Sequence, residues 1–328
     1  MRGFPGDDHH YFKGRVLHFI NIAMADPETA VSEENISSVA SQCMYENIRG
    51  SDIIGAHLKG LRQMIDMRGG INNLSSDQGC LGEISILQDA IHACCSNVSP
   101  FMIDITDPVL REVRSLGPEQ FYPQSPLRIV NDVGLFRPHT ELESSVEILK
   151  DAFDGFEMLC LEVFDPTKAA EDEEISRFRR DKSFSRLRPS SVTFGNELPS
   201  SALEKAEEAI RLAARIHFRA VALRMPHDDE VNVEDMTRLH TVLRNMDMQF
   251  WKVAHYVYLW ILLTGGAASH GHPDQRPYFV SEQMRLGLSI GLLDWRSFKQ
   301  TLGNFLWLQQ FLRREKSVQP TGFVVGST

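Results

Sequence analysis

The sequence lacks paired cysteines. Five cysteines are scattered along 328 residues, and no Cys-x-x-Cys pair occurs among them. Structural zinc sites usually take their ligands from such closely spaced pairs, and an odd number of scattered thiols does not suggest a disulfide framework. We therefore interpret the cysteines as reduced core residues of a protein from the cytosol or the nucleus. They are Cys43, Cys80, Cys94, Cys95 and Cys160.

Positive charge is also scarce. The formal net charge is −10 and the isoelectric point is about 5.7. Nucleic acid phosphates are bound mainly by Lys and Arg and repel an anionic surface. The charge balance therefore favours a protein or a small molecule as the partner, with no direct nucleic acid binding.

Long apolar runs are absent as well. The strongest candidate, Val253–Ala268, contains His255 and is shorter than the ~18–20 apolar residues that span a bilayer, so we interpret it as a buried core helix. The mildly apolar stretch Val16–Met24 is interrupted by His18 and Asn21, with no small-residue cleavage site after it. The sequence therefore predicts neither a membrane segment nor a secretory signal.

The common catalytic motifs are missing. The chain has no Gly-x-Gly-x-x-Gly after a strand, no Gly-x4-Gly-Lys, no Gly-x-Ser-x-Gly and no His-Glu-x-x-His. Dinucleotide binding, phosphoryl transfer and the commonest hydrolase and zinc-peptidase mechanisms thus lack support. We predict no catalytic residue, no cofactor and no metal.

Two weaker constellations contain side chains that could carry chemistry. His270, His272 and Asp274 offer nitrogen and oxygen ligands, but the glycine and proline between them indicate a turn after a helix, where polar residues are common. His92 and Cys94 resemble a base and a nucleophile. Because they are two positions apart, they lie on different faces of a helix, which argues against a dyad.

Helical periodicity is present along most of the chain. We predict an all-α fold: a large, irregular helical domain of about ten helices with one long disordered loop. Short β-like pieces occur only near Leu127–Val133 and Gly322–Val325. The expected helices are Tyr11–Ala25, Ser37–Ile48, Ser51–Arg68, Leu81–Asn97, Val109–Ser115, Glu141–Phe164, Ser201–Arg224, Val233–Thr264, Ser281–Leu288 and Trp295–Arg314.

One segment interrupts this pattern. Residues 165–199 contain an acidic run, a basic run and a Ser/Pro stretch, with too few apolar residues for a packed face. We expect residues 165–199 to form a disordered charged loop between two parts of one helical domain, residues 11–164 and 200–315. Residues 1–10 and 316–328 are expected to be disordered termini.

The helix expected at Ser51–Arg68 has a clear start and a clear end. Ser51 can cap its first turn, and apolar residues recur on one stripe. Gly69 and Gly70 follow, and a helix commonly ends on a residue with positive φ, which glycine adopts without strain. Arg68 is expected either to bond the last carbonyls of this helix or to pair with a buried acid such as Asp89.

This helix resembles a signature of the regulatory domain of fungal zinc-cluster transcription factors. The resemblance extends, in the expected order, over most of residues 40–315, through Gly82–Phe101, Ile216–Pro226, Tyr258–Phe279 and Phe305–Leu312. We interpret the glycine pair near residue 265 as a site of close helix packing or of a helix end. The matching signature residues, which we interpret as structural, are His57, Gly60, Leu61, Met64, Arg68, Gly69, Gly70, Asp89, Trp260, Gly265 and Gly266.

The resemblance implies a non-catalytic domain that regulates transcription through protein partners or a small-molecule effector. We expect the chain to lie in the nucleus, with the cytoplasm as the alternative, and to form a homodimer or a heterodimer. The six-cysteine zinc cluster that reads DNA in this family is absent from the sequence. True loss, a late start of the gene model and an excised domain are three explanations that stay open. DNA reading is therefore not transferred to this chain.

Two alternatives belong to other classes of protein. One is an all-α, cofactor-free enzyme with His57, His92 or His217 as a base, which two of these residues in one polar pocket would favour. The other is a structural partner of a full-length paralogue. An exposed apolar patch on a terminal helix would favour that reading.

Overall fold

The computed structural model describes residues 6–74, 80–102, 123–132, 142–171, 199–291 and 293–318. Within these ranges the chain forms helices and loops, with no strand, so the predicted all-α fold is confirmed. The helix expected at Val109–Ser115, the β-like piece at Gly322–Val325 and residues 172–198 of the expected loop lie outside the described residues.

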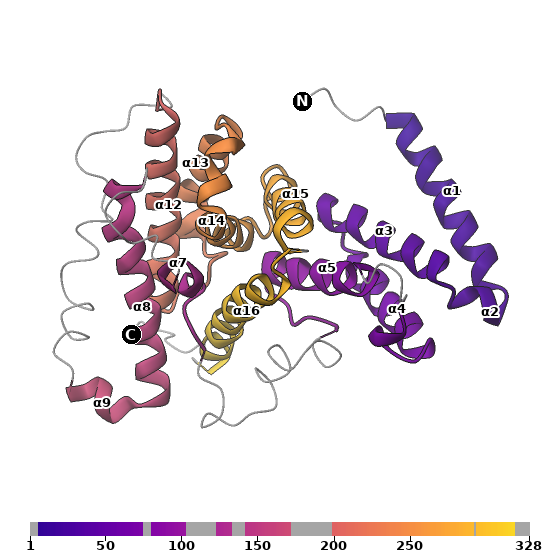
Figure 1. Cartoon of the computed structure of the whole chain (residues 1–328), viewed down its shortest axis with the longest axis horizontal. Coiled ribbons are helices and arrows are strands. Elements are labelled where there is room, and N and C mark those ends of the chain that lie inside the picture. Colours follow the sequence, from indigo (N-terminus) through magenta and orange to yellow (C-terminus); the bar gives the residue numbers. More distant parts are fainter. Residues whose placement is uncertain are drawn as a thin grey trace, which may run out of the picture.

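The helices follow one another along the chain (Figure 1). The α-helices are α1 (Gly6–Met24), α2 (Pro27–Ala30), α3 (Glu33–Arg49), α4 (Ile54–Met67), α5 (Cys80–Ser96), α7 (Arg128–Asp132), α8 (Val146–Phe164), α9 (Pro166–Glu171), α12 (Ala202–Leu223), α13 (Val233–Arg244), α14 (His255–Ala268), α15 (Arg276–Leu286) and α16 (Trp295–Val318). Short 3-10 turns are η1 (Ile71–Asn73), η2 (Glu143–Ser145), η3 (Glu230–Asn232) and η4 (Met248–Val253), and a π-helical turn, η5 (Gly287–Gly291), follows α15.

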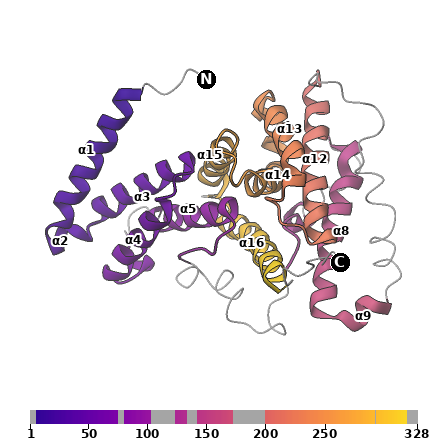
Figure 2. The same cartoon turned by 180° about the vertical axis from the view of Figure 1, so that it is seen from behind.

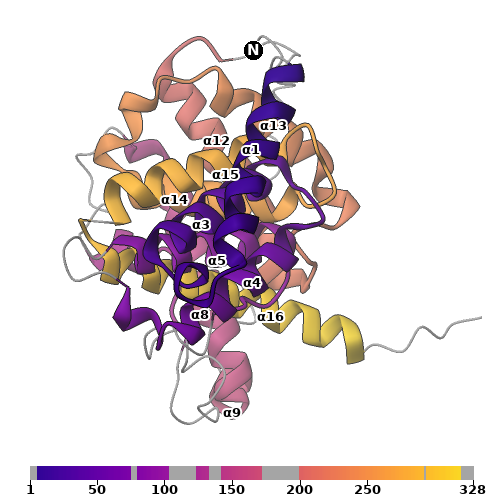
Figure 3. The ribbon, with the colours of Figure 1, turned by 90° about the vertical axis from the view of Figure 1, so that its right-hand side faces the viewer.

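The molecule has two flanks and a centre. Helices α1–α4 form one flank, α8, α9, α12 and α13 form the other, and α5 and α14–α16 lie between them (Figures 1 and 2). Seen from the α1 side, α1 and α3 lie in front of the central helices (Figure 3). The largest hydrophobic cluster contains buried residues from both sides of residues 165–199, such as Leu149 of α8 and Ile210 of α12.

Helix α14 lies in the middle of this core. Every residue from Tyr256 to Ala268 is buried, as expected for a core helix. Trp260 is fully buried, with its ring 5.6 Å from that of His217 in a T-shaped arrangement. In the part of the chain that is described, no helix combines the length and the apolar character needed to cross a membrane.

The glycine pair of α14 faces α15. A Cβ added at Gly265 would overlap the ring of Phe279, and one added at Gly266 would overlap the amide of Gln283 and lie 2.8 Å from the sulfur of Cys95. Close packing, one of the two predicted roles, is therefore what the geometry shows. The backbone of α14 continues past both glycines, to Ala268.

Three expectations about local structure were wrong. The single helix expected at Val233–Thr264 is divided into α13, η4 and α14, and Asp247 starts η4 by accepting a hydrogen bond from the Gln249 N–H at 2.9 Å. The β-like piece at Leu127–Val133 contains helix α7 instead. Ser51 does not cap α4, which starts at Ile54 without a side-chain cap.

The expected segment boundaries also differ from the structure. Helix α1 starts at Gly6, inside the segment 1–10 that was expected to be disordered. Helix α9 (Pro166–Glu171) lies inside the expected loop 165–199, and α16 reaches Val318, beyond the expected boundary at 315. Helix α9 has a favourable start, because its first residue is a proline and the Lys168 N–H donates to the Asp165 Oδ1.

Candidate functional site

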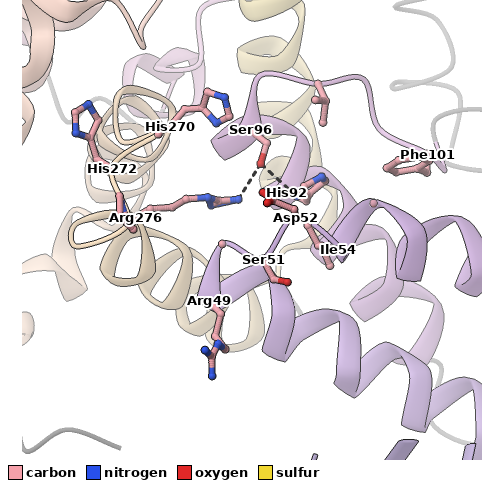
Figure 4. A pocket seen from close by; sticks show the side chains of 15 residues that line it. Arg49, Ser51, Asp52, Ile54, His92, Ser96, Phe101, His270, His272 and Arg276 are labelled. Carbon is pink, nitrogen blue, oxygen red and sulfur yellow. Dashed lines mark hydrogen bonds between the residues drawn. The ribbon is translucent and has the colours of Figure 1, made fainter.

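A pocket of about 560 Å³ lies where three segments of the chain meet. Its walls come from the α3–α4 turn between Arg49 and Gly55, from the end of α5 and the following residues between His92 and Phe101, and from the α14–α15 connection between His270 and Arg276 (Figure 4). This volume is in the range of small-molecule binding sites, about 300–1,000 Å³.

Each wall contains a sharp turn made by a residue with positive φ. Gly50 ends α3 with φ +66°, Asn97 follows α5 with φ +51°, and Gly271 lies in the α14–α15 connection with φ +79°. The left-handed conformation suits glycine and is tolerated by asparagine. Gly50 and Asn97 end α3 and α5 at the pocket, and Gly271 turns the chain between α14 and α15, so that the residues beside these turns line the pocket.

Arg276, the first residue of α15, extends into the pocket (Figure 4). Its Nη2 donates to the Ser96 Oγ at 2.8 Å, and lies 3.5 Å from the Asn47 Oδ1. The residue is only 6% exposed, and its buried Nη1 has no hydrogen-bond partner among the described groups. A buried guanidinium without a carboxylate is unfavourable, so this charge favours an anion in the pocket.

His92 forms the wall beside Arg276. Its Nδ1 is 3.3 Å from the Ser96 Oγ, so the two side chains share one hydroxyl. Burial, with smaller contributions from the charges of Arg276 and His270, lowers the pKa of His92 to about 4. His92 is therefore neutral near pH 7 and adds hydrogen-bonding capacity to the pocket without adding charge.

The rim of the pocket carries the remaining ionisable groups. Asp52 and His270 are exposed, and His272 is half-buried. The Arg49 Nη1 donates to the Tyr45 Oη at 2.6 Å, and its guanidinium points away from Arg276 in Figure 4. Of the two arginines in the described lining, Arg276 is thus the one that directs its charge into the pocket.

The apolar part of the lining includes Ile54, Phe101 and Pro273. The buried carboxylate of Asp89 fixes Phe101: the Phe101 N–H donates to Oδ1 at 2.9 Å, and the Met102 N–H donates to Oδ2 at 2.6 Å. Asp89, a predicted signature residue, therefore positions the wall of the pocket without lining it.

The signature residues of α4 lie behind the pocket rather than in it. Leu61 and Met64 are buried in a second core cluster between α3 and α4. As predicted, Gly69 (φ +101°) and Gly70 (φ +99°) have positive φ where α4 ends. None of the predicted residues His57, Gly60, Leu61, Met64, Arg68, Gly69, Gly70, Asp89, Trp260, Gly265 and Gly266 belongs to the pocket lining.

Arg68 has neither of its two expected partners. Its Nη2 forms an ion pair with the Glu33 Oε1 at 2.7 Å, and its Nη1 donates to the Val31 carbonyl at 3.0 Å. Arg68 thus links the end of α4 to the start of α3. The acid proposed for it, Asp89, receives backbone N–H groups instead.

The three histidines of the enzyme alternative do not share a pocket. Only His92 lines the pocket described here. His217 is fully buried against Phe156 and Trp260, with a pKa lowered to about 4 by burial. Burial also raises the pKa of the Cys94 thiol, the proposed nucleophile beside His92, well above its ordinary value.

The turn at residues 270–274 contributes to the pocket rather than to a metal site. His270 and His272 belong to the lining, whereas Asp274 does not. In the described ranges, no group of three His, Cys, Asp or Glu side chains is arranged to hold a metal ion.

Sequence reasoning assigned no functional role to Arg276 or Ser96. Arg276 lies in the resemblance segment Tyr258–Phe279, and its burial depends on α3 and α5, which are distant in sequence. A usable signal was its position directly before Pro277: a proline in a first helical turn marks the start of α15 at the pocket.

A family model described as "Fungal specific transcription factor domain" matches residues 5–314. Neither the comparison with curated proteins nor the comparison with solved structures gave a significant match.

Proposed function

Because the chain belongs to the family of fungal specific transcription factor domains, we propose that it is a regulatory domain that changes transcription when a small effector binds beside Arg276. The observation that supports an effector is the buried guanidinium of Arg276, which lines a pocket of metabolite size and has no acidic partner among the described residues. A buried charge without an acidic partner destabilises the fold, and an anionic effector would compensate it.

The pocket is well placed to affect the packing of the helices. Its walls belong to α3, α5 and α15, and each of these helices packs against the other two. An effector that contacts all three segments stabilises the arrangement in which they are close together, and so shifts the population toward it. The resulting change in the protein surface alters the binding of a protein partner.

The proposed setting is the nucleus, with protein partners rather than direct contacts to nucleic acid. The family supports a nuclear role, and the net charge of −10 opposes DNA binding by this chain. Catalysis has less support, because the histidines considered as bases lie in separate environments.

A transcription reporter tests the proposal. The chain is fused to a heterologous DNA-binding domain, and reporter output is compared with that of the DNA-binding domain alone at equal protein level. We expect the fusion to change the output several-fold, in either direction. The comparison is repeated in several growth media of different composition. Equal reporter output from the fusion and from the DNA-binding domain alone in every medium would contradict a regulatory function.

A second candidate role, binding to a second copy or a paralogue, is supported by α1. Tyr11, Phe12, Phe19 and Ile22 are each more than half exposed. At about 100° per residue, these four side chains fall within an arc of about 100° on the helix. An apolar stripe of this kind on a peripheral helix often marks a protein interface.

Sedimentation equilibrium tests this second role. We expect the purified chain to dimerise in a concentration-dependent way, and the double variant Phe12→Glu/Phe19→Glu to be monomeric. Ser37→Glu, on the exposed face of α3, is the matched control. A monomeric wild type at the highest attainable concentration would exclude homodimerisation through α1.

A further inference from the structure

We infer that the pocket beside Arg276 binds a small organic acid, with a carboxylate on the guanidinium and an apolar body against Phe101, Ile54 and Pro273. This inference rests on the proposed function, since it names the chemical class of the effector.

The Arg276 donors that have no partner among the described residues favour a carboxylate as the ligand group. One edge of the Arg276 guanidinium is occupied, because Nη2 is bound to the Ser96 Oγ at 2.8 Å. The Nη1 group is buried and without a partner among the described residues. Charge-assisted bonds from arginine to a carboxylate are among the stronger hydrogen bonds in proteins, and they are stronger still where water is excluded.

The charges around the pocket support a single negative charge on the ligand. Arg276 is a buried cation, His92 is neutral near pH 7, and the Arg49 guanidinium is bound to Tyr45. Asp52 on the rim opposes an anion, but it is exposed and therefore screened by solvent, while His270 and His272 belong to the same lining. One cation matches one carboxylate better than it matches a phosphate dianion.

The apolar lining indicates that the acid has a body. The volume of about 560 Å³ far exceeds what a bare carboxylate fills, and Phe101 offers an aromatic surface held in place by Asp89. Ligand pockets commonly combine such apolar walls with a few oriented polar groups. We therefore expect affinity to rise with the size of the apolar part.

The test uses acetate, butyrate, hexanoate and 3-phenylpropionate, each paired with its neutral primary amide, together with inorganic phosphate. Binding to the intact chain is measured by isothermal titration and by the shift in melting temperature. We expect the acids to bind more tightly as their body grows, with 3-phenylpropionate at least tenfold tighter than its amide. Equal binding of acids and amides would overturn the inference, and so would phosphate binding as tightly as 3-phenylpropionate.

Two variants locate the site. Arg276→Met should weaken binding of 3-phenylpropionate at least tenfold, whereas Arg285→Met removes a charge from the exposed side of the same helix, outside the pocket lining, and should leave binding within twofold. Unchanged binding to Arg276→Met would overturn the inference.

A measurement on the wild type covers the case in which Arg276→Met does not fold. In protein labelled with ¹⁵N-glycine, 3-phenylpropionate should shift the signals of the pocket glycines Gly50, Gly55 and Gly271, and leave that of Gly155 in α8 unchanged. Shifts that spare the pocket glycines would overturn the inference.

The experiments distinguish an error in the ligand class from an error in the proposed function. If acids bind here without any reporter response, only the proposed function is contradicted. If the reporter responds to Arg276→Met while no acid binds, only the ligand class is contradicted.

Discussion

At the scale of single residues, three buried histidines make the stability of the chain depend on pH. Burial lowers the pKa of His92 to about 4, that of His217 to about 4 and that of His227 to about 3. An unfolded chain returns each side chain to an ordinary pKa near 6.5. The unfolded state therefore binds protons first when the pH falls.

Because the pKa values of these histidines are lower in the folded state, the protein is less stable at low pH. Stability from the neutral histidines is fully present above about pH 6.5, and is lost as the pH falls toward their folded values of about 4 and 3. Between pH 7.5 and pH 5 we expect the free energy of unfolding to fall by about 2 kcal/mol for each of these histidines. Urea denaturation at the two pH values measures this loss.

Two variants test whether His227 contributes to this loss of stability at low pH. His227 packs against Phe305, and neither of its ring nitrogens has a hydrogen-bond partner among the described groups, so His227→Leu should reduce the pH dependence by about one histidine's share. His18→Gln, on the exposed side of α1, should leave it unchanged. Equal pH dependence in His227→Leu and the wild type would refute this account.

The glycines give a second prediction at this scale. Gly265→Ala places a methyl group against the ring of Phe279, and we expect it to lower the free energy of unfolding by roughly 1–3 kcal/mol. Gly60→Ala is the control, because a Cβ at this helical position meets nothing within 4 Å, and alanine there should stabilise by about 0.5–1 kcal/mol. Both values come from urea denaturation. A Gly265→Ala variant as stable as Gly60→Ala would show that the packing explanation is wrong.

Sequence reasoning found the glycines but not the arginine, for a physical reason. A glycine pair in an apolar helix indicates close packing locally, whereas the burial of Arg276 is created by Ser96 and Asn47, 180 and 229 residues away along the chain. Only the folded structure brings these three residues together.

At the scale of elements, the helices were predictable where local signals agreed. Helix α12 has a capping box at Ser201 and Glu204 and starts one residue after the expected position. The break between α13 and α14 was missed, because the side chain of Asp247 competes with helical hydrogen bonding, which hydrophobic periodicity does not report. Helix α7 was mistaken for a β-like piece, since short apolar runs do not distinguish the two structures.

The connection after α5 gives the prediction that belongs to this scale. Asp89→Ala removes the acceptor for the N–H groups of Phe101 and Met102, and hydrogen bonds to a charged group contribute about 1.5–3 kcal/mol each. We expect Asp89→Ala to lower the free energy of unfolding by at least this amount, as measured by urea denaturation. Asp89→Asn keeps one acceptor oxygen and should lose less.

The relative stability of Asp89→Ala and Asp89→Asn distinguishes the loss of acceptor bonds from the loss of charge. If Asp89→Asn were as destabilised as Asp89→Ala, the loss would come from the missing charge and not from the acceptor bonds that position Phe101. Asp52→Asn, on the exposed rim of the pocket, controls for the removal of a negative charge and should leave stability nearly unchanged.

At the scale of the whole molecule, the all-α class was predictable and the pocket was not. The class follows from helical periodicity along the chain. The pocket depends on how α3, α5 and α15 approach one another, which is decided by contacts between distant segments such as Arg276 and Ser96. The resemblance to the family led to residues that pack the core, and the functional candidate lies at the ends of those helices.

The most direct test of the account compares two single-residue variants in the transcription reporter. The chain fused to a heterologous DNA-binding domain is measured as the wild type, Arg276→Met and Arg285→Met, at equal protein level and with each fold checked by circular dichroism. If the pocket beside Arg276 controls transcription, Arg276→Met should change reporter output several-fold and Arg285→Met, which lies outside the pocket lining, should match the wild type. Output from folded Arg276→Met that equals that of the wild type would contradict the account.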